Sequence, residues 1–227
     1  ACRRMVRERQ EGSGRAGDRD RRAGGLGKST VGRLLAERLG LTYLDTGAMY
    51  RAVAFAAIRR GIDPMDPEPV AQLARSLELR VGEEGVVVDG VDATVEIRGP
   101  EVSRAVSHVA ANPGVRDELR ERQRAWAREH GGGVIEGRDI GSVVFPDAVL
   151  KVYLTADPEV RAQRRAAEMG DVDAARIAAE IERRDAMDRN REHNPLVTPD
   201  GAVTVDTTGL SIDDVLNLLV SLVEERS

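Results

Sequence analysis

The chain has 227 residues, 41% of them hydrophobic and 32% charged, which is typical of one globular domain and excludes a disordered chain. Its net charge of −5 argues against nucleic acid or an anionic membrane as the main partner. Without an apolar run of roughly 18 residues, an N-terminal signal core or a cysteine besides Cys2, we expect a cytoplasmic protein with no membrane segment and no disulfide framework.

From residue 24 onward, short strand-like runs alternate with amphipathic helical runs. The expected helices are 29–39, 48–60, 67–77, 102–111, 115–129, 158–169, 173–192 and 211–225. The expected strands are 41–45, 133–136, 150–155 and 203–207, and a small antiparallel insert is expected from runs at 77–81, 86–89 and 93–97. This alternation predicts an α/β fold with a parallel sheet, in which the apolar strands 133–136 and 150–155 are buried.

A glycine-rich loop opens the first helix and has the composition of a phosphate-binding site. It reads Gly24-Gly25-Leu26-Gly27-Lys28-Ser29-Thr30. Glycines let backbone N–H groups approach a phosphate, and a helix N-terminus favours anions. In this role Lys28 reaches the β- and γ-phosphates of ATP, and the Ser29 hydroxyl binds Mg²⁺. The alternative is a glycine-rich turn that only caps a helix.

The residues before this loop do not fit a phosphate-binding motif. In the pattern G-x-x-x-x-G-K-[ST] the first glycine falls on Arg22, and residues 17–22 read GDRDRR where a buried strand is expected. One back-translation of residues 17–25, read one nucleotide later, encodes V-I-A-I-D-G-P-A, a hydrophobic strand that enters a phosphate loop. We therefore hypothesise that residues 1–23 are a non-native segment, produced by a frame error that ends near Gly25. A genuine disordered basic arm is the alternative.

Four further segments follow the loop in a characteristic order. They are LDTGAMYRAV at 44–53, AVSHVAANPGVR at 105–116, EGRDIGSVVFP at 136–146 and RRDAMDRNR at 183–191. The N-K-x-D base reader of GTPases is absent from the sequence. As a set, the segments resemble the bacterial cytidylate kinase family over about residues 24–225. The resemblance implies a three-layer P-loop nucleoside-monophosphate kinase core at 24–227, with the β insert at about 77–98 and a lid, a mobile cover over the site, at about 157–185.

The resemblance also implies a reaction and its site residues. A monomer would transfer a phosphoryl group from ATP, with Mg²⁺, to CMP or dCMP. Such transfer needs charge neutralisation and positioning, for which arginine supplies planar, bidentate donors. The catalytic residues implied are Lys28, Arg51, Arg138, Arg184 and Arg191. The acceptor contacts implied are Thr46, Arg51, Ser107, Arg116, Arg138, Asp139, Arg184, Asp188 and Arg191. Arg161 and Arg165 of the lid would join the loop residues in binding ATP.

Arg184, Asp188 and Arg191 are spaced i, i+4 and i+7, so they share one helix face. By the resemblance, Asp188 accepts a hydrogen bond from the cytosine amino group, which favours cytosine over uracil.

Plainer interpretations remain for these residues. The residues on the shared helix face could form a solvated salt-bridge ladder. Thr46 could be a helix N-cap and Arg51 a surface residue of its helix. Arg138 and Asp139 could form a structural ion pair. Two other functions also remain. One is a related kinase for UMP, AMP or shikimate, and the other is an inactive nucleotide-binding product of a frameshifted gene.

Overall fold

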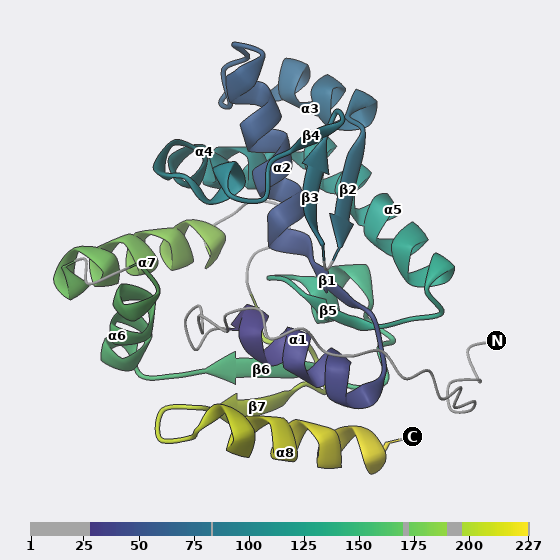
Figure 1. The fold of residues 1–227 in the computed structure, drawn as a ribbon, viewed down its shortest axis with the longest axis vertical. Helices are drawn as coiled ribbons and strands as arrows, with labels where there is room; N and C mark the ends of the chain where they lie inside the picture. Colours follow the sequence, from purple (N-terminus) through teal and green to yellow (C-terminus); the bar gives the residue numbers. More distant parts are fainter. Residues whose placement is uncertain (1–27, 83, 170–172, 190–196, 227) are drawn as a thin grey trace.

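Helices and strands alternate along the chain in the computed structural model, which describes residues 28–82, 84–169, 173–189 and 197–226. The fold is α/β, as the sequence predicts, with parallel strands, covering helices and a small antiparallel sheet (Figure 1). Most predicted elements are present within a few residues of their expected ends. Residues 1–23, on which the frame-error hypothesis rests, and most of the glycine loop lie outside the described residues.

The parallel strands form two separate pairs. β1 (Tyr43–Asp45) pairs with β5 (Val134–Glu136), and β6 (Val152–Thr155) pairs with β7 (Val203–Asp206). Within the described residues, no strand joins β5 to β6. Every residue of β5 and β6 is only half-buried, so the expectation that these two strands are buried was wrong. A parallel strand is fully buried only when it has neighbours on both sides and layers on both faces.

The larger hydrophobic core surrounds α2 (Thr46–Arg59), which is buried along most of its length. Helices α3 (Pro67–Ser76), α4 (Pro100–Ala111) and α5 (Pro113–Glu129) pack around it. Local sequence sets where these helices begin. Proline at the first helical position starts α3, α4 and α5, because the missing N–H is not needed there. The Asn112 side chain caps α5 by accepting from Gly114 N and Val115 N.

The antiparallel insert covers one side of this core. It contains β2 (Leu79–Gly82), β3 (Gly85–Val88) and β4 (Val91–Asp92), followed by the 3₁₀ helix η1 (Glu96–Arg98). The predicted third strand at 93–97 was therefore wrong. The Asp92 carboxylate accepts from the backbone N and the hydroxyl of Thr94, at 2.9 and 2.6 Å, and this local hydrogen bonding turns the chain after β4.

The smaller hydrophobic core joins the two ends of the described chain. It lies between α1 (Lys28–Leu39) and α8 (Ile212–Glu224), with β6 and part of β5 packed against it. Figure 1 shows α8 along β7 and α1 beside it. The predicted capping box at the start of α8 is present, because Ser211 Oγ accepts from Asp214 N and the Asp214 carboxylate accepts from Ser211 N.

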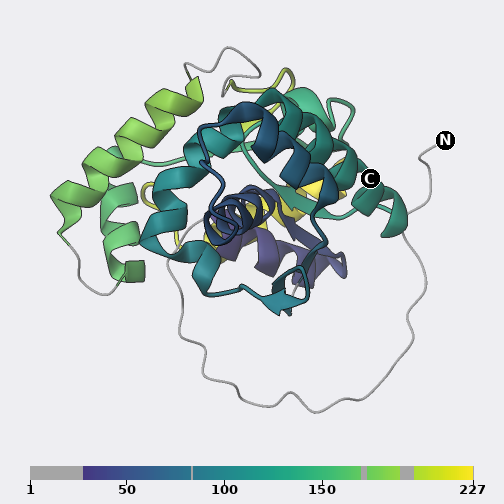
Figure 2. The same ribbon diagram turned by 90° about the horizontal axis from the view of Figure 1, so that it is seen from above.

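Two further helices form an arm at one side of the molecule (Figures 1 and 2). They are α6 (Pro158–Met169) and α7 (Ala174–Arg189), which pack on each other, and α7 also touches α4. They occupy most of the predicted lid range, and their role as a lid stays a prediction. A π-helical turn, η2 (Ile140–Val144), follows β5 and was not predicted. Among the described residues, each helix is too short or too polar to cross a membrane.

Candidate active site

The carboxyl ends of β1 and β5 meet at the centre of the molecule. Asp45 and Glu136 are register partners there, and Thr46 Oγ1 donates to the carbonyl oxygen of Glu136 at 2.7 Å. A Cβ on Gly137 would lie 2.4 Å from Thr46 Oγ1, so only glycine allows this approach. Asp45, not Thr46, is the N-cap of α2, because its carboxylate accepts from Ala48 N. The N-cap interpretation of Thr46 was therefore wrong.

A carboxylate at this edge contacts the start of the loop helix. Glu136 Oε1 accepts from Ser29 Oγ at 3.2 Å, and Glu136 Oε2 accepts from Tyr43 Oη at 2.6 Å. Burial, together with the negative charge of Glu136, raises the pKa of the Tyr43 hydroxyl. Gly32 lets α1 approach this ring, since a Cβ there would lie 2.8 Å from Tyr43 Cε2. The first turn of α1 is thus held at the carboxyl end of β5.

Glu136 and Tyr43 were not among the predicted site residues. A signal for Glu136 was present in the sequence, because it ends an apolar strand at the edge where parallel sheets bind their ligands.

Arg51 lies on α2 and points toward the start of α4. It is half-buried, and its Nη1 donates to Ile97 O and to Ser103 Oγ, both at 3.0 Å. The interpretation of Arg51 as an exposed surface residue was therefore wrong. Its contact with an acceptor phosphate stays a prediction.

Asp139 forms a buried ion pair with Arg116, whose side chain is 3% exposed. Arg116 also donates to Ala110 O at 3.1 Å, and its guanidinium carbon lies 6.0 Å from the centre of the Tyr50 ring. The Nε of Arg116 is buried and has no hydrogen-bond partner among the described residues. A buried donor of this kind is costly unless an acceptor reaches it.

Arg138 points away from this pair and contacts the helical arm. Its Nη1 donates to Asp185 Oδ1 of α7 at 2.8 Å, and Arg161 of α6 donates to Asp185 Oδ2 at 2.6 Å. Arg138 and Asp139 therefore belong to two different ion pairs. Burial opposes ionisation of the Asp185 carboxyl, but the two arginines outweigh burial and lower its pKa. Asp185 was not among the predicted site residues.

For the other predicted residues, the structure gives the helix to which each belongs and, for some of them, its burial. Ser107 is half-buried on α4, Thr30 is half-buried on α1, and Arg165 is exposed on α6. Arg184 and Asp188 belong to α7, and Lys28 begins α1. The residues outside the described part of the chain are Gly24, Gly25, Leu26, Gly27 and Arg191.

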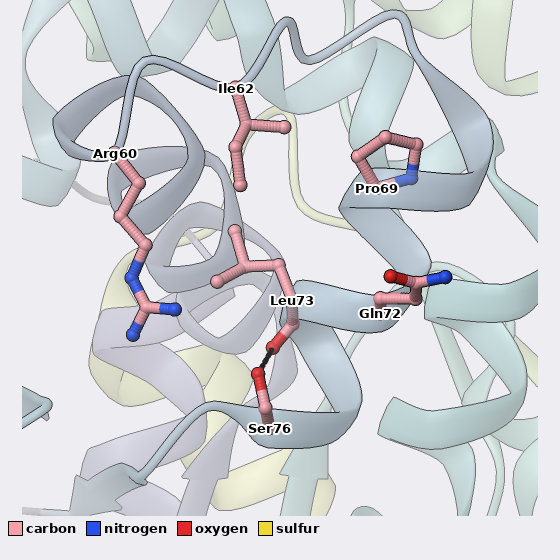
Figure 3. A pocket seen from close by; sticks show the side chains of 6 residues that line it. All are labelled: Arg60, Ile62, Pro69, Gln72, Leu73 and Ser76. Atoms are coloured by element: carbon pink, nitrogen blue, oxygen red, sulfur yellow. Dashed lines mark hydrogen bonds between the residues drawn. The ribbon is translucent and has the colours of Figure 1, made fainter.

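A shallow concavity lies elsewhere, between the end of α2 and α3 (Figure 3). Its lining residues are Arg60, Ile62, Pro69, Gln72, Leu73 and Ser76. Ser76 Oγ donates to Leu73 O within it, and Arg60 pairs with Asp89. No predicted site residue lines this concavity, and its lining contains no carboxylate, so we place the chemistry at the ends of β1 and β5.

The fold and this site define a class of protein. A helix that starts with Lys-Ser and contacts a carboxylate at the end of a parallel strand, with Arg138 two residues after that carboxylate, is the arrangement expected of a P-loop kinase.

Comparison with known proteins gives the family. The cytidylate kinase family model matches residues 23–225. The chain is 49% identical to the cytidylate kinase of Rhodococcus opacus and 48% identical to that of Desulforamulus reducens. These alignments cover 89% and 88% of this chain and 92% and 93% of the relatives. A bifunctional pantoate ligase/cytidylate kinase of a Synechococcus species is 47% identical over 88% of this chain and 41% of its own length. The chain belongs to the cytidylate kinase family and is a nucleoside-monophosphate kinase.

Proposed function

We propose that this chain transfers the γ-phosphoryl group of ATP to CMP and dCMP. The contact between Ser29 Oγ and Glu136 Oε1, across 107 residues of sequence, carries the proposal. It brings the helix start that follows the glycine loop to a strand-end carboxylate. Backbone N–H groups at such a helix start favour phosphate oxygens, and in this proposal Lys28, the first residue of the helix, approaches the β- and γ-phosphates.

The donor atoms near Ser29 fit Mg²⁺. Magnesium prefers oxygen ligands, and in kinases it binds one or two carboxylates together with substrate phosphates. The Ser29 hydroxyl and the Glu136 carboxylate, 3.2 Å apart, would hold it. When bound, the ion neutralises charge on the transferred phosphoryl group. Tyr43 holds the second oxygen of Glu136, which keeps the first oxygen turned toward Ser29.

The acceptor side supports a polar base and its phosphate. The unpaired Nε of buried Arg116 offers a donor to a ring acceptor of cytosine. Ser107, on the preceding helix, and Asp139, paired with Arg116, would complete that contact. Asp188 would accept from the exocyclic amino group.

The phosphates would be bound by arginines from separate elements. Arg51 and Arg138 would bind acceptor phosphate, joined by Arg184 and Arg191, while Arg161 and Arg165 would bind ATP. Neutralised charge and in-line placement are what this transfer requires, and no protein nucleophile takes part. A lid at 157–185 would exclude water and so suppress ATP hydrolysis. All these groups belong to one chain, which supports a monomer.

One observation favours a second candidate, a nucleotide-binding product with little activity. The described parallel strands are separated into two pairs, and β5, which carries Glu136, is only half-buried. A weakly supported strand would place the carboxylate less well.

The experiment is a coupled assay of ADP formation with CMP, dCMP, UMP, AMP and shikimate in parallel. We expect CMP and dCMP to be the best acceptors, and a better rate with any of the other three would contradict the proposal. An active-site lysine stabilises transition-state charge, so Lys28→Ala should lower kcat by roughly 10²–10³-fold. Lys151→Ala is the matched control, because the chain has no other lysine and Lys151 Nζ donates to Pro146 O. Equal rates for the two variants would overturn the loop assignment.

Base selection has its own test. Asp188→Ala should lower kcat/KM for CMP at least tenfold more than for UMP, since only cytosine offers an amino donor. Glu182→Ala, an exposed carboxylate on the same helix, should change neither. Equal losses for CMP and UMP would show that Asp188 does not read the base.

A further inference from the structure

One carboxylate joins three parts of the molecule that the proposed reaction must bring together. Asp185 lies on α7, and its two oxygens each accept from a different arginine, at 2.8 and 2.6 Å. Arg138 follows β5, where Glu136 is located, while Arg161 lies on α6. The Asp185 side chain is only 8% exposed. The contact therefore links the edge of the central strands to both helices of the arm.

The position of Asp185 along α7 separates it from the predicted acceptor face. Residues 184 and 188 lie about one helical turn apart, whereas residue 185 is rotated by about 100° from residue 184 and by about 60° from residue 188. This rotation turns Asp185 toward Arg138 and Arg161. A buried carboxylate is strongly destabilising when it is unpaired, and here each oxygen has a charged partner.

The two arginine partners limit which side chain can replace Asp185. An asparagine of the same shape keeps one acceptor oxygen, but its N–H₂ group would face the second guanidinium, donor against donor. One arginine would then have to move. In the proposed function one arginine neutralises charge on the acceptor phosphate and the other on the phosphates of ATP. They stabilise the transition state best when they are already in position, because preorganised donors cost no reorganisation during the reaction.

We propose that Asp185 is a positioning residue, which holds Arg138 and Arg161 in the orientation that phosphoryl transfer requires. This inference rests on the proposed function, since it assigns the two arginines to the acceptor and donor phosphates. In this role Asp185 acts through the two arginines, since each of its oxygens already accepts from one of them. Its loss should therefore lower kcat more than it raises KM for CMP or ATP.

The experiment compares Asp185→Asn and Asp185→Glu with Asp213→Asn in the full chain. Asp213, at the start of α8, pairs with Arg38 of α1 at 3.0 Å and is 81% exposed, so Asp213→Asn is a control that removes one exposed aspartate–arginine pair. We expect Asp185→Asn to lower kcat at least tenfold with KM values within about threefold. Asp185→Glu keeps the charge but moves the carboxylate by one methylene, so Tm should recover while kcat stays low. Asp213→Asn should match the unsubstituted chain.

A second readout does not depend on activity. Modification by phenylglyoxal, followed by mass spectrometry of the peptides, should label Arg138 and Arg161 several-fold faster in Asp185→Asn than in the unsubstituted chain. Recovery of both Tm and kcat in Asp185→Glu, or unchanged labelling in Asp185→Asn, would overturn the positioning role. If the unsubstituted chain phosphorylates no acceptor, the proposed function fails, whereas the labelling and Tm still test whether Asp185 orients the two arginines.

The pH dependence sharpens the result. The folded-state pKa of Asp185 is lowered, so its stabilising effect is complete above the ordinary carboxyl pKa of about 4 and is lost as pH falls below it. The difference in Tm between the unsubstituted chain and Asp185→Asn should stay constant from pH 5.5 to 8 and shrink below about pH 4. If this difference in Tm changed near neutral pH instead, its pH dependence would come from a group other than Asp185.

Discussion

The two hydrophobic cores differ in how completely their strands and helices are covered. In the larger core, α2 contributes Ala52, Val53 and Ala57, all with no exposed surface, and α5 contributes fully buried Leu119. In the smaller core, α1 and α8 pack against β6, whose four residues are all half-buried. The larger core is built from residues 44–135, so its helices and strands find their packing partners within one continuous stretch of the chain. The smaller core depends on strands that lack a described neighbour between β5 and β6, and its burial is correspondingly poorer.

The largest expected effect comes from supplying an apolar strand before the loop. Rewriting residues 17–25 as V-I-A-I-D-G-P-A-G replaces a run with five charges in six residues. Two or three newly buried side chains would contribute about 1.5–3 kcal/mol each, which corresponds to a rise in Tm of at least about 6 °C. We expect CMP-dependent ATP consumption to rise as well. Differential scanning calorimetry and the coupled assay measure both.

A control separates the strand from the loop. The version V-K-A-K-D-G-P-A-G restores the glycine pattern but keeps charges at alternate positions, which a central strand cannot bury. It should raise activity and Tm less than the apolar version. If the original and the apolar version have the same Tm and the same activity, the frame-error hypothesis is wrong and the basic arm is native.

A matched pair of leucines tests the difference in burial directly. Leu119→Ala should lower the free energy of unfolding by about 2–5 kcal/mol, because it empties a fully buried site. Leu154→Ala, in β6, should cost about half as much, since its side chain is already partly exposed. Urea denaturation of both variants gives the comparison. In the rewritten chain the cost of Leu154→Ala should rise toward that of Leu119→Ala, and equal costs in the original chain would contradict the contrast.

The smallest expected effects come from two helix caps. Ser211→Ala removes the capping box of α8 and should cost about 1 kcal/mol. Asn112→Ala removes the α5 cap and also the donor to Pro67 O, at 2.7 Å, so it should cost about 2 kcal/mol. Thermal unfolding measures both. A larger loss for Ser211→Ala would show that the smaller core is the more sensitive to its helix ends.

The sequence predicted local features better than contacts across the chain. Glycine and proline gave most helix ends, and the spacing of Ser211 and Asp214 gave a cap that the structure confirms. Burial of β5 and β6 was wrong because it depends on neighbouring strands, which a strand's own composition does not reveal. Thr94 likewise looked like part of a strand, although its two hydrogen bonds to Asp92 turn the chain.

The candidate site shows the same limit. Ser29, Arg138 and Asp139 were predicted from motifs, but their partners were not. Asp185 is 47 residues from Arg138, and Glu136 is 107 residues from Ser29. Periodicity assigns residues to a helix face, yet it does not say which distant side chain that face meets. These partners are visible only once the fold brings the strand ends and the helical arm together.

The pairing of α1 with α8 has a consequence for synthesis. Arg38 donates to Asn217 and Asp213, which follow it by 179 and 175 residues. On the ribosome, α1 emerges well before α8, while residues 44–135 can already bury their own apolar side chains. We therefore expect the middle of the chain to fold during translation. The helix that begins with Lys28 cannot pack until α8 has been synthesised, so chains released before α8 would expose the apolar face of α1 to chaperones and proteases.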